Sequence, residues 1–311
     1  MARPALAALA AGLTLAAGCG RPAAPHMASG AWEVMGTIFT VGAWGRDSAA
    51  LDAAVHQAYD SLRLVDSLLS TYRDDSEISR VNRGAGSAGR PVSAALAAVL
   101  GEALRVARRS GGAFDPTLRD WRGVAFDSAA RTVRLQPGLR LDFGGIAKGY
   151  ALDRAALALA GVADSAVLSL GGQLLVLGEA PHAPGRPVGI PDPDNPLVLL
   201  ALVDLPPGQR SVSTSSQGEQ AGHIIDPRTG RAAARARSVT VVAPTAIAAD
   251  AWSTALFVLG CDSALAFAVG LGADGAGAMS VVCADDRVRW TADLDGSVSL
   301  PTDSAPPGRG P

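Results

Sequence analysis

Two residues in the segment AADAWSTALFVL (residues 248–259) have side chains suited to binding a metal ion. If the segment is a helix, Asp250 and Thr254 lie on one face, four positions apart, among almost entirely apolar neighbours. A carboxylate in such surroundings is either paired or bound to a ligand. A carboxylate and a hydroxyl on adjacent turns are oxygen ligands that Mg²⁺ accepts beside substrate phosphates. The same spacing also fits a carboxylate that favours the helix dipole, with Thr254 bonded back to the backbone.

A second feature is the glycine-rich segment LDFGGIAKGYALD (residues 141–153), which leads into a predicted helix. Glycines before a helix start often bring backbone N–H groups close to a phosphate. The spacing, however, matches neither the dinucleotide-binding fingerprint nor the Walker pattern. A Gly-Gly turn of this kind can also serve packing alone, so the segment by itself does not identify a ligand.

Two polar residues lie in turn-rich segments. His223 follows a loop rich in Ser, Thr and Gly, and histidine is the side chain that most readily acts as a base near neutral pH. A half-solvated histidine at a strand end is the alternative. Asp115 precedes a proline in GGAFDPT, which holds it in an extended conformation. It either faces a ligand or belongs to a simple Asp-Pro turn.

Composition excludes several classes of function. The chain has 311 residues, 48% of them hydrophobic, which is enough for a large buried core. A net charge of -2 and only 5% aromatic residues argue against a nucleic-acid partner. The sequence contains no cluster of Cys and His residues of the kind that predicts a zinc site. Cys261 and Cys283 either pair or remain as two buried thiols.

The N-terminus is typical of an export signal, with Arg3 followed by an Ala/Leu run too short to span a bilayer. Ala17 and Gly18 before Cys19 resemble the lipoprotein signal, in which the cysteine becomes the lipidated first residue. The leucine that this signal usually has three places before the cysteine lies one position earlier here, at Leu15. A plain secretory signal with an incidental Cys19 is the alternative. We expect a signal peptide over residues 1–18, a tether over 19–30, a single domain over 31–300 and a disordered tail over 301–311.

Hydrophobic periodicity and turn residues predict strands in runs between helices. Because few strict βαβ units occur, this order favours an α+β fold over a doubly wound sheet. The proline-rich residues 181–196 are predicted to form a loop. We expect helices over residues 48–69, 93–107, 147–160 and 245–259, and strands over residues 33–43, 131–135, 166–170, 174–177, 197–205, 238–243, 280–283 and 288–291.

The order of the motifs is more specific than any one of them. MGT (35–37), STYRDDSEISRVN (70–82), GGAFDPT (111–117), LDFGGIAKGYALD, SLGGQLLVLG (169–178), HIIDPRTG (223–230) and SVTVVAPTAIAADAWSTALFVLG (238–260) follow one another along the chain. In this order they resemble the motifs of the ApbE-type FAD:protein FMN transferases, from about Trp32 to Gly260. The resemblance implies an α+β, T-fold-like architecture of mixed sheets flanked by helices around a deep FAD cleft.

The resemblance also implies a chemistry. Members of this family cleave the pyrophosphate of FAD with Mg²⁺, transfer FMN to a threonine or serine hydroxyl of an acceptor protein as a phosphoester, and release AMP. By matching motif positions, the metal ligands would be Gly145, Asp250 and Thr254, and the base that deprotonates the acceptor hydroxyl would be His223. FAD would be bound by Met35, Tyr72, Ala113, Phe114, Asp115, Asp142 and Lys148.

Partners and location follow from the same resemblance. The acceptor would be a subunit of an NADH:quinone reductase, of a related electron-transport complex, or an exported flavoprotein, reached in the periplasm from a lipid anchor on Cys19. Segments 116–141 and 216–222, in the walls of the cleft, are shorter than is usual in the family. An FAD pyrophosphatase and a flavin-binding lipoprotein without turnover are the alternatives. Retention of Asp250, Thr254, Lys148 and His223 together argues against the pure binder.

Overall fold

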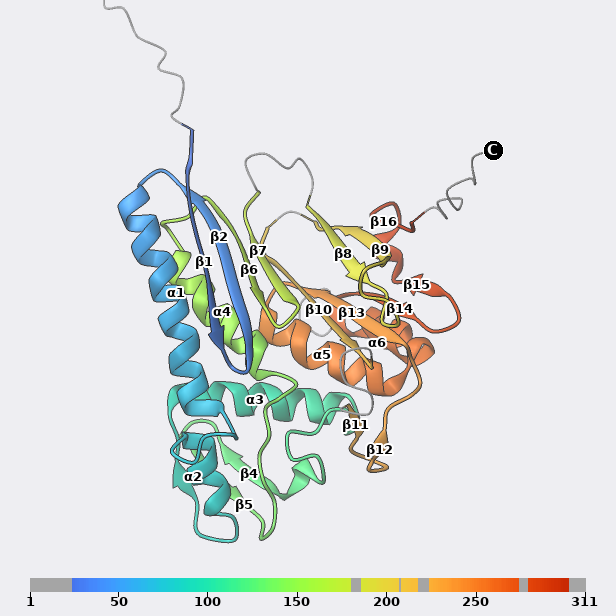
Figure 1. Cartoon of the computed structure of the whole chain (residues 1–311). Coiled ribbons are helices and arrows are strands. Elements are labelled where there is room, and N and C mark those ends of the chain that lie inside the picture. Colours follow the sequence, from blue (N-terminus) through green and yellow to red (C-terminus); the bar gives the residue numbers. More distant parts are fainter. Residues whose placement is uncertain (1–23, 180–185, 207, 218–223, 274–278, 302–311) are drawn as a thin grey trace, which may run out of the picture.

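A computed structural model of the chain describes residues 24–179, 186–206, 208–217, 224–273 and 279–301. Its centre is an eight-stranded antiparallel sheet with the order β1-β2-β6-β7-β10-β13-β14-β15 (Figure 1). The strands are β1 (His26–Val34), β2 (Thr37–Gly45), β6 (Ser165–Leu170), β7 (Gln173–Leu177), β10 (Arg210–Ser216), β13 (Ser238–Ala243), β14 (Ser280–Ala284) and β15 (Val288–Trp290).

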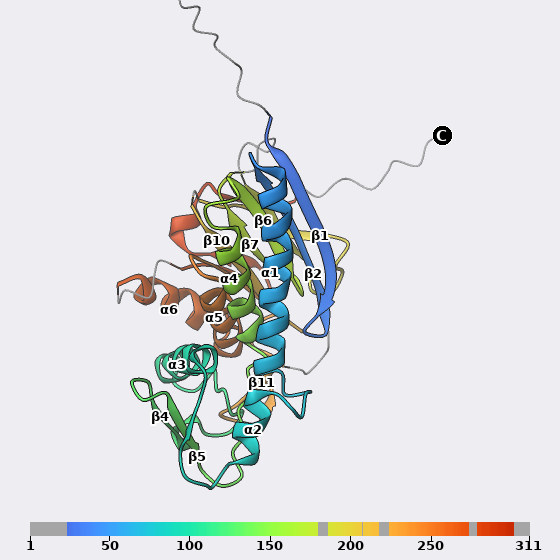
Figure 2. The same cartoon turned by 90° about the vertical axis from the view of Figure 1, so that its left-hand side faces the viewer.

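Helices cover one face of this sheet, and a small sheet covers part of the other (Figures 1 and 2). The helices that pack on the sheet are α1 (Ser48–Leu69), α4 (Ala147–Leu159), α5 (Ala246–Leu259) and α6 (Cys261–Ala273). The other two, α2 (Glu77–Arg83) and α3 (Ala94–Arg109), lie below the sheet in Figure 1. The small sheet has the order β16-β9-β8, with β8 (Pro187–Pro191), β9 (Leu199–Asp204) and β16 (Val298–Ser299). This arrangement confirms the predicted α+β class of sheets flanked by helices.

Two shorter sheets complete the described part of the chain. β3 (Arg90–Pro91), β5 (Thr132–Leu135) and β4 (Val124–Asp127) form one, below α3 in Figure 1. β11 (Ile225–Asp226) and β12 (Arg231–Ala232) form the other. Within the described residues, no helix is long and apolar enough to cross a bilayer.

Amphipathic periodicity explains α1, and burial on nearly all sides explains α5. In α1 the apolar residues that recur at helical spacing, among them Leu51, Leu62 and Leu69, are buried, and Asp47 caps the helix by accepting the N–H of Ala50. Helix α5 is buried around most of its circumference because it packs against the sheet, α4 and α6. Asp250 and Ser253 of α5 are therefore removed from water, while Thr254 is half-buried.

Several elements differ from the sequence-based expectation. The single strand predicted over residues 33–43 is a hairpin, because Met35 and Gly36 both adopt positive φ (53° and 71°) and form a two-residue turn between β1 and β2. Strand β1 begins at His26, so residues 26–30, predicted to be tether, pair with β2. The proline-rich segment predicted as a loop contains β8, an edge strand, where the missing proline N–H is tolerated.

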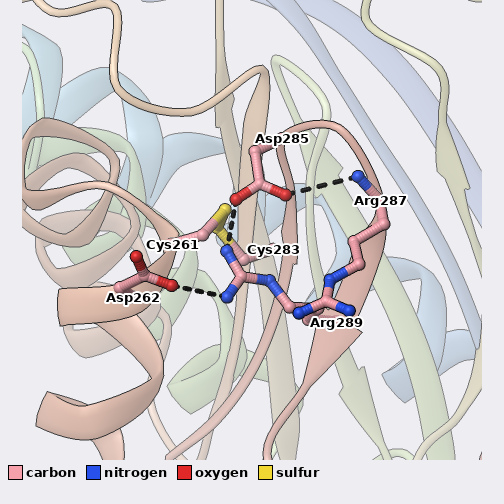
Figure 3. Close-up of a disulfide and its surroundings, with 6 residues drawn as sticks. All are labelled: Cys261, Asp262, Cys283, Asp285, Arg287 and Arg289. Carbon is pink, nitrogen blue, oxygen red and sulfur yellow. Dashed lines mark hydrogen bonds and ion pairs between the residues drawn. A yellow bond between two sulfur atoms is a disulfide. The ribbon is translucent and has the colours of Figure 1, made fainter.

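The two cysteines form a disulfide between the start of α6 and β14, which decides between the two alternatives for Cys261 and Cys283 (Figure 3). Beside it, Arg289 of β15 donates to Asp262 of α6 at 2.6 Å and to Asp285. The covalent bond and these ion pairs fasten α6 to the edge of the central sheet. The predicted signal peptide and lipidated Cys19, and all but the first residue of the predicted tail, lie outside the described residues.

Candidate active site

The carboxylate of Asp250 is buried in the second turn of α5, with its residue only 5% exposed. Its Oδ2 accepts the N–H of Gly149, at the start of α4, at 2.9 Å. Burial raises the pKa of Asp250, while the charge of Lys148 and the hydrogen bond from Gly149 lower it. Its other oxygen, Oδ1, accepts no hydrogen bond from any described residue. That oxygen is available to a cation, which would relieve the desolvation of the charge.

Gly145 and Thr254 lie against each other beside this carboxylate. A Cβ added at Gly145 would be 3.1 Å from Thr254 Oγ1 and 3.3 Å from the ring of Phe114. The Thr254 hydroxyl donates to the carbonyl of Asp250 at 3.3 Å, as the alternative interpretation expected, and its lone pairs remain free to bind a cation. The structure thus brings together the three predicted metal ligands, from two segments about a hundred residues apart.

The donor chemistry of this site fits Mg²⁺. Asp250 offers a carboxylate, Thr254 a hydroxyl and Gly145 a backbone carbonyl, all hard oxygen ligands. Among the described residues, no three His, Cys, Asp or Glu side chains cluster, which argues against a zinc-type centre there. With so few protein ligands, the remaining positions around the ion would belong to water and to substrate oxygens, as is usual for Mg²⁺.

A junction between α4 and α5 holds these ligands in register. Thr245, the N-cap residue of α5, makes no capping bond through its side chain. Instead, Asp153 of α4 accepts the N–H groups of Ala246 and Ile247 at 2.8 and 2.9 Å. Burial raises the pKa of Asp153 to about 6, and these two hydrogen bonds partly oppose the rise. Gly149 lies so close to α5 that an added Cβ would be 2.2 Å from the carbonyl oxygen of Ala246.

Serine hydroxyl groups connect α5 to strand β10 of the central sheet. Ser253 Oγ, fully buried, lies 3.2 Å from Ser213 Oγ and 3.0 Å from Ser215 Oγ, both on β10. It also donates to the carbonyl of Asp250 at 2.9 Å. These serines were not identified from the sequence. The alternation of Ser213 and Ser215 within a Ser/Thr run was the available signal, since alternate residues of a strand share one face.

A pocket of about 470 Å³ opens beside the glycine-rich loop, between the β1–β2 turn and the end of α1. It is lined by four of the predicted FAD-binding residues: Met35, Tyr72, Asp142 and Lys148. Tyr72 is 99% exposed, so its ring is free to stack on a ligand. Asp142 Oδ1 accepts the N–H of Gly144 at 2.7 Å and thereby shapes the loop. The pocket and the metal ligands meet at Lys148, next to the Gly149–Asp250 contact.

The other predicted residues lie elsewhere. Ala113 and Phe114 are buried behind Gly145 and do not line this pocket. The Asp115 carboxylate accepts the N–H and the hydroxyl of Thr117, both at 2.7 Å, and the N–H of Trp121 at 3.0 Å. Its side chain therefore stabilises the turn, and its contribution to FAD binding would come from the backbone. His223 lies outside the described residues.

A larger hollow of about 710 Å³ lies on the opposite side of α4, where Tyr150, Asp153 and Arg154 contribute to its wall. It contains none of the predicted site residues. The smaller pocket is the better candidate, because Gly144 and Lys148 in its wall adjoin Gly145 and Gly149 in the chain. The candidate Mg²⁺ ligands therefore lie next to this pocket, although none of them lines it. A lysine, a glycine-rich loop and hard oxygen ligands are thus neighbours here. These are the groups that a metal-dependent phosphoryl-transfer enzyme needs.

Comparison with known proteins agrees with that class. The sequence matches the ApbE family over residues 35–124 and 118–275. It is 33% identical over 306 residues to an FAD:protein FMN transferase of Treponema pallidum, covering 80% of this chain and 83% of that one. To the enzyme of the same name from Salmonella typhimurium it is 32% identical over 279 residues, covering 75% and 78%. The chain belongs to the ApbE family.

Solved structures share the fold. The flavin transferase ApbE from Vibrio cholerae superposes with a TM-score of 0.75 at 24% identity, over 88% of this chain and 99% of that one. The apo form of the Pseudomonas stutzeri flavinyl transferase ApbE gives a TM-score of 0.75 at 23% identity, over 89% and 98%. The chain therefore shares the fold of these ApbE structures.

Proposed function

We propose that this protein is a Mg²⁺-dependent FAD:protein FMN transferase. It cleaves the FAD pyrophosphate, attaches FMN through a phosphoester to a threonine or serine of an acceptor protein, and releases AMP. The observation that carries this proposal is the convergence of Gly145, Asp250 and Thr254 next to the Lys148 pocket. Its relatives of that name, which are 32–33% identical over at least three quarters of the chain, support the same activity.

Each residue of the site would have a separate role in this reaction. Gly145, Asp250 and Thr254 would hold the Mg²⁺, which supplies positive charge to the pyrophosphate oxygens when bound. Lys148 adds a second positive charge at the same end of the pocket, and Tyr72 offers a flat surface for a ring of FAD. The acceptor hydroxyl oxygen forms its bond to the FMN phosphorus while the bond from that phosphorus to the AMP oxygen breaks. The hydroxyl proton passes to His223, the predicted base.

We also propose that the protein works in the periplasm, lipid-anchored to the membrane through Cys19. The Cys261–Cys283 disulfide supports an oxidising location, since disulfides are rare in cytosolic proteins. The signal-like residues 1–18 support export. An acceptor in this compartment would be a subunit of an NADH:quinone reductase or of a related electron-transport complex, or an exported flavoprotein.

One experiment separates the candidate activities. The full chain, purified in detergent, is incubated with FAD, Mg²⁺ and a candidate acceptor, and acceptor mass, free FMN and AMP are measured. An acceptor mass gain equal to an FMN phosphoester supports transfer, free FMN without that gain indicates an FAD pyrophosphatase, and FAD binding without AMP indicates a flavin-binding protein.

Variants test the assigned roles in the same assay. Asp250→Ala is expected to abolish AMP release, and unchanged release would remove the metal assignment. His223→Ala is expected to abolish transfer, and a normal transfer rate would exclude its role as base. Asp60→Asn is the matched control, because its side chain on α1 is 69% exposed, pairs with the exposed Arg63 and does not line the Lys148 pocket.

A further inference from the structure

Asp66, in the last turn of α1, lines the same pocket as Met35, Tyr72 and Lys148 but has no assigned role. Its carboxylate accepts no hydrogen bond from any described residue. Arg73, whose charge lowers the pKa of Asp66, forms its ion pair with Asp75 instead, at 3.3 Å. The carboxylate of Asp66 is therefore held in the pocket without a protein donor.

This contrasts with the other two aspartates of the region. Asp115 is saturated by the turn that follows it, and Asp142 uses Oδ1 to hold the glycine-rich loop. Asp66 does neither. Burial raises its pKa and the charge of Arg73 lowers it, so the carboxylate is partly desolvated without a compensating bond. A ligand that donates to it would recover this lost hydrogen bonding.

A carboxylate is an unexpected neighbour for the pyrophosphate of FAD, because like charges repel. FAD, however, carries its negative charge only at the centre. Both of its ends present neutral donors: the ring N–H and ribityl hydroxyls of the flavin half, and the amino group and ribose hydroxyls of the adenosine half. A pocket with Lys148 and Asp66 in its wall therefore distinguishes the centre of the dinucleotide from its ends.

We propose that Asp66 accepts a hydrogen bond from a neutral N–H or O–H donor of FAD and so orients the dinucleotide in the pocket. The pyrophosphate is attracted to Lys148 and repelled by Asp66, and the donor-bearing end occupies the space beside α1. This inference rests on the proposed function, because it requires that FAD bind in this pocket. It makes Asp66 a determinant of binding and orientation that does not take part in the chemistry.

The test is a binding measurement on the full chain in detergent, by calorimetry, with no turnover required. Loss of a hydrogen bond to a charged group lowers affinity about 10- to 100-fold, and we expect Asp66→Ala, which removes the acceptor, to bind FAD weaker by that factor. Riboflavin and ADP, titrated separately, locate the donor: the half that donates to Asp66 is the one whose affinity falls. Asp60→Asn, an exposed change on the same helix, is expected to bind as wild type does.

Melting temperatures establish that the variants are folded. Asp66→Asn keeps one acceptor oxygen without the charge and is expected to lose less FAD affinity, and it serves if Asp66→Ala does not fold. Unchanged affinity for all three ligands in a folded variant overturns the proposal. Tighter FAD binding overturns it as well, since it would mean that Asp66 only repels the ligand. A wild-type protein that binds no FAD would instead refute the proposed function, on which this inference depends.

Discussion

The crossing of α4 over the start of α5 leaves no room for a side chain at Gly149, and Gly149→Ala tests what this contact does. The added Cβ would be 2.2 Å from the oxygen of Ala246 and 2.7 Å from the Cα of Ile247. Both are backbone atoms, so no side chain can rotate away. Because even a close carbon–oxygen contact needs about 3.3 Å, the two helices must separate by about 1 Å.

That separation determines the expected size of the effect. It would lengthen the 2.9 Å hydrogen bond from Gly149 to Asp250 beyond bonding distance. Overpacking costs about 1–3 kcal/mol and loss of a hydrogen bond to a charged group about 1.5–3 kcal/mol, while alanine favours the helix over glycine by about 1 kcal/mol. We therefore expect Gly149→Ala to lower the free energy of unfolding by about 2–5 kcal/mol.

Urea unfolding and Mg²⁺-dependent AMP release measure the two consequences. AMP release is expected to fall with stability, because the shift moves Asp250 away from Gly145. The matched control is Gly101→Ala in α3, where the added methyl group meets Phe126 at an ordinary 3.6 Å and should be neutral or slightly stabilising. If Gly149→Ala unfolds at the wild-type urea concentration and releases AMP at the wild-type rate, the crossing does not position the site.

Three further predictions concern stability. The pKa of Asp153 is about 6 in the folded protein against 3.8 in the unfolded chain, so the folded state binds this proton more tightly. As the pH rises from about 4 to about 6, this residue should therefore lower the free energy of unfolding, by up to about 3 kcal/mol. In urea unfolding across that range, Asp153→Asn should remove this slope, and an identical slope would contradict the assignment. Replacing both Cys261 and Cys283 by serine opens a loop of 22 residues and should cost about 3 kcal/mol, seen as a lower Tm that reductant no longer changes. Ser253→Ala leaves the two β10 hydroxyls without their partner and should cost about 1–3 kcal/mol in urea unfolding. Ser61→Ala, which removes only a hydrogen bond from a half-buried hydroxyl to its own helix, should be close to neutral.

The sequence was sufficient for the parts of the site that depend on local periodicity. Asp250 and Thr254 share a helical face because they are four residues apart, and the apolar residues around them predicted the observed burial. The order of the motifs predicted the family and the approach of Gly145 to this pair. The first of these features follows from spacing within one helix, and the second follows from an order of motifs that extends along most of the chain.

Contacts between distant segments were not predictable in this way. Asp153 was seen only as a residue within a predicted helix, because the N–H groups it accepts lie 93 residues further along the chain. The strand β10 was missed since its residues are hydroxylic rather than alternately apolar, and its buried serines are satisfied by α5. Similarly, β8 was hidden by prolines that an edge position tolerates.

The contacts made by the segment LDFGGIAKGYALD (residues 141–153) explain why its glycine spacing matches no standard phosphate-binding motif. Gly145 lies so close to Thr254 that an added Cβ would be 3.1 Å from its hydroxyl oxygen, and Gly149 lets α5 approach within contact distance and donates to Asp250. One turn later, Asp153 caps α5. Two of the glycines thus serve contacts with a second helix rather than with the phosphate. A single segment therefore both lines the Lys148 pocket and, through Gly149 and Asp153, holds the start of α5, the helix that carries Asp250 and Thr254.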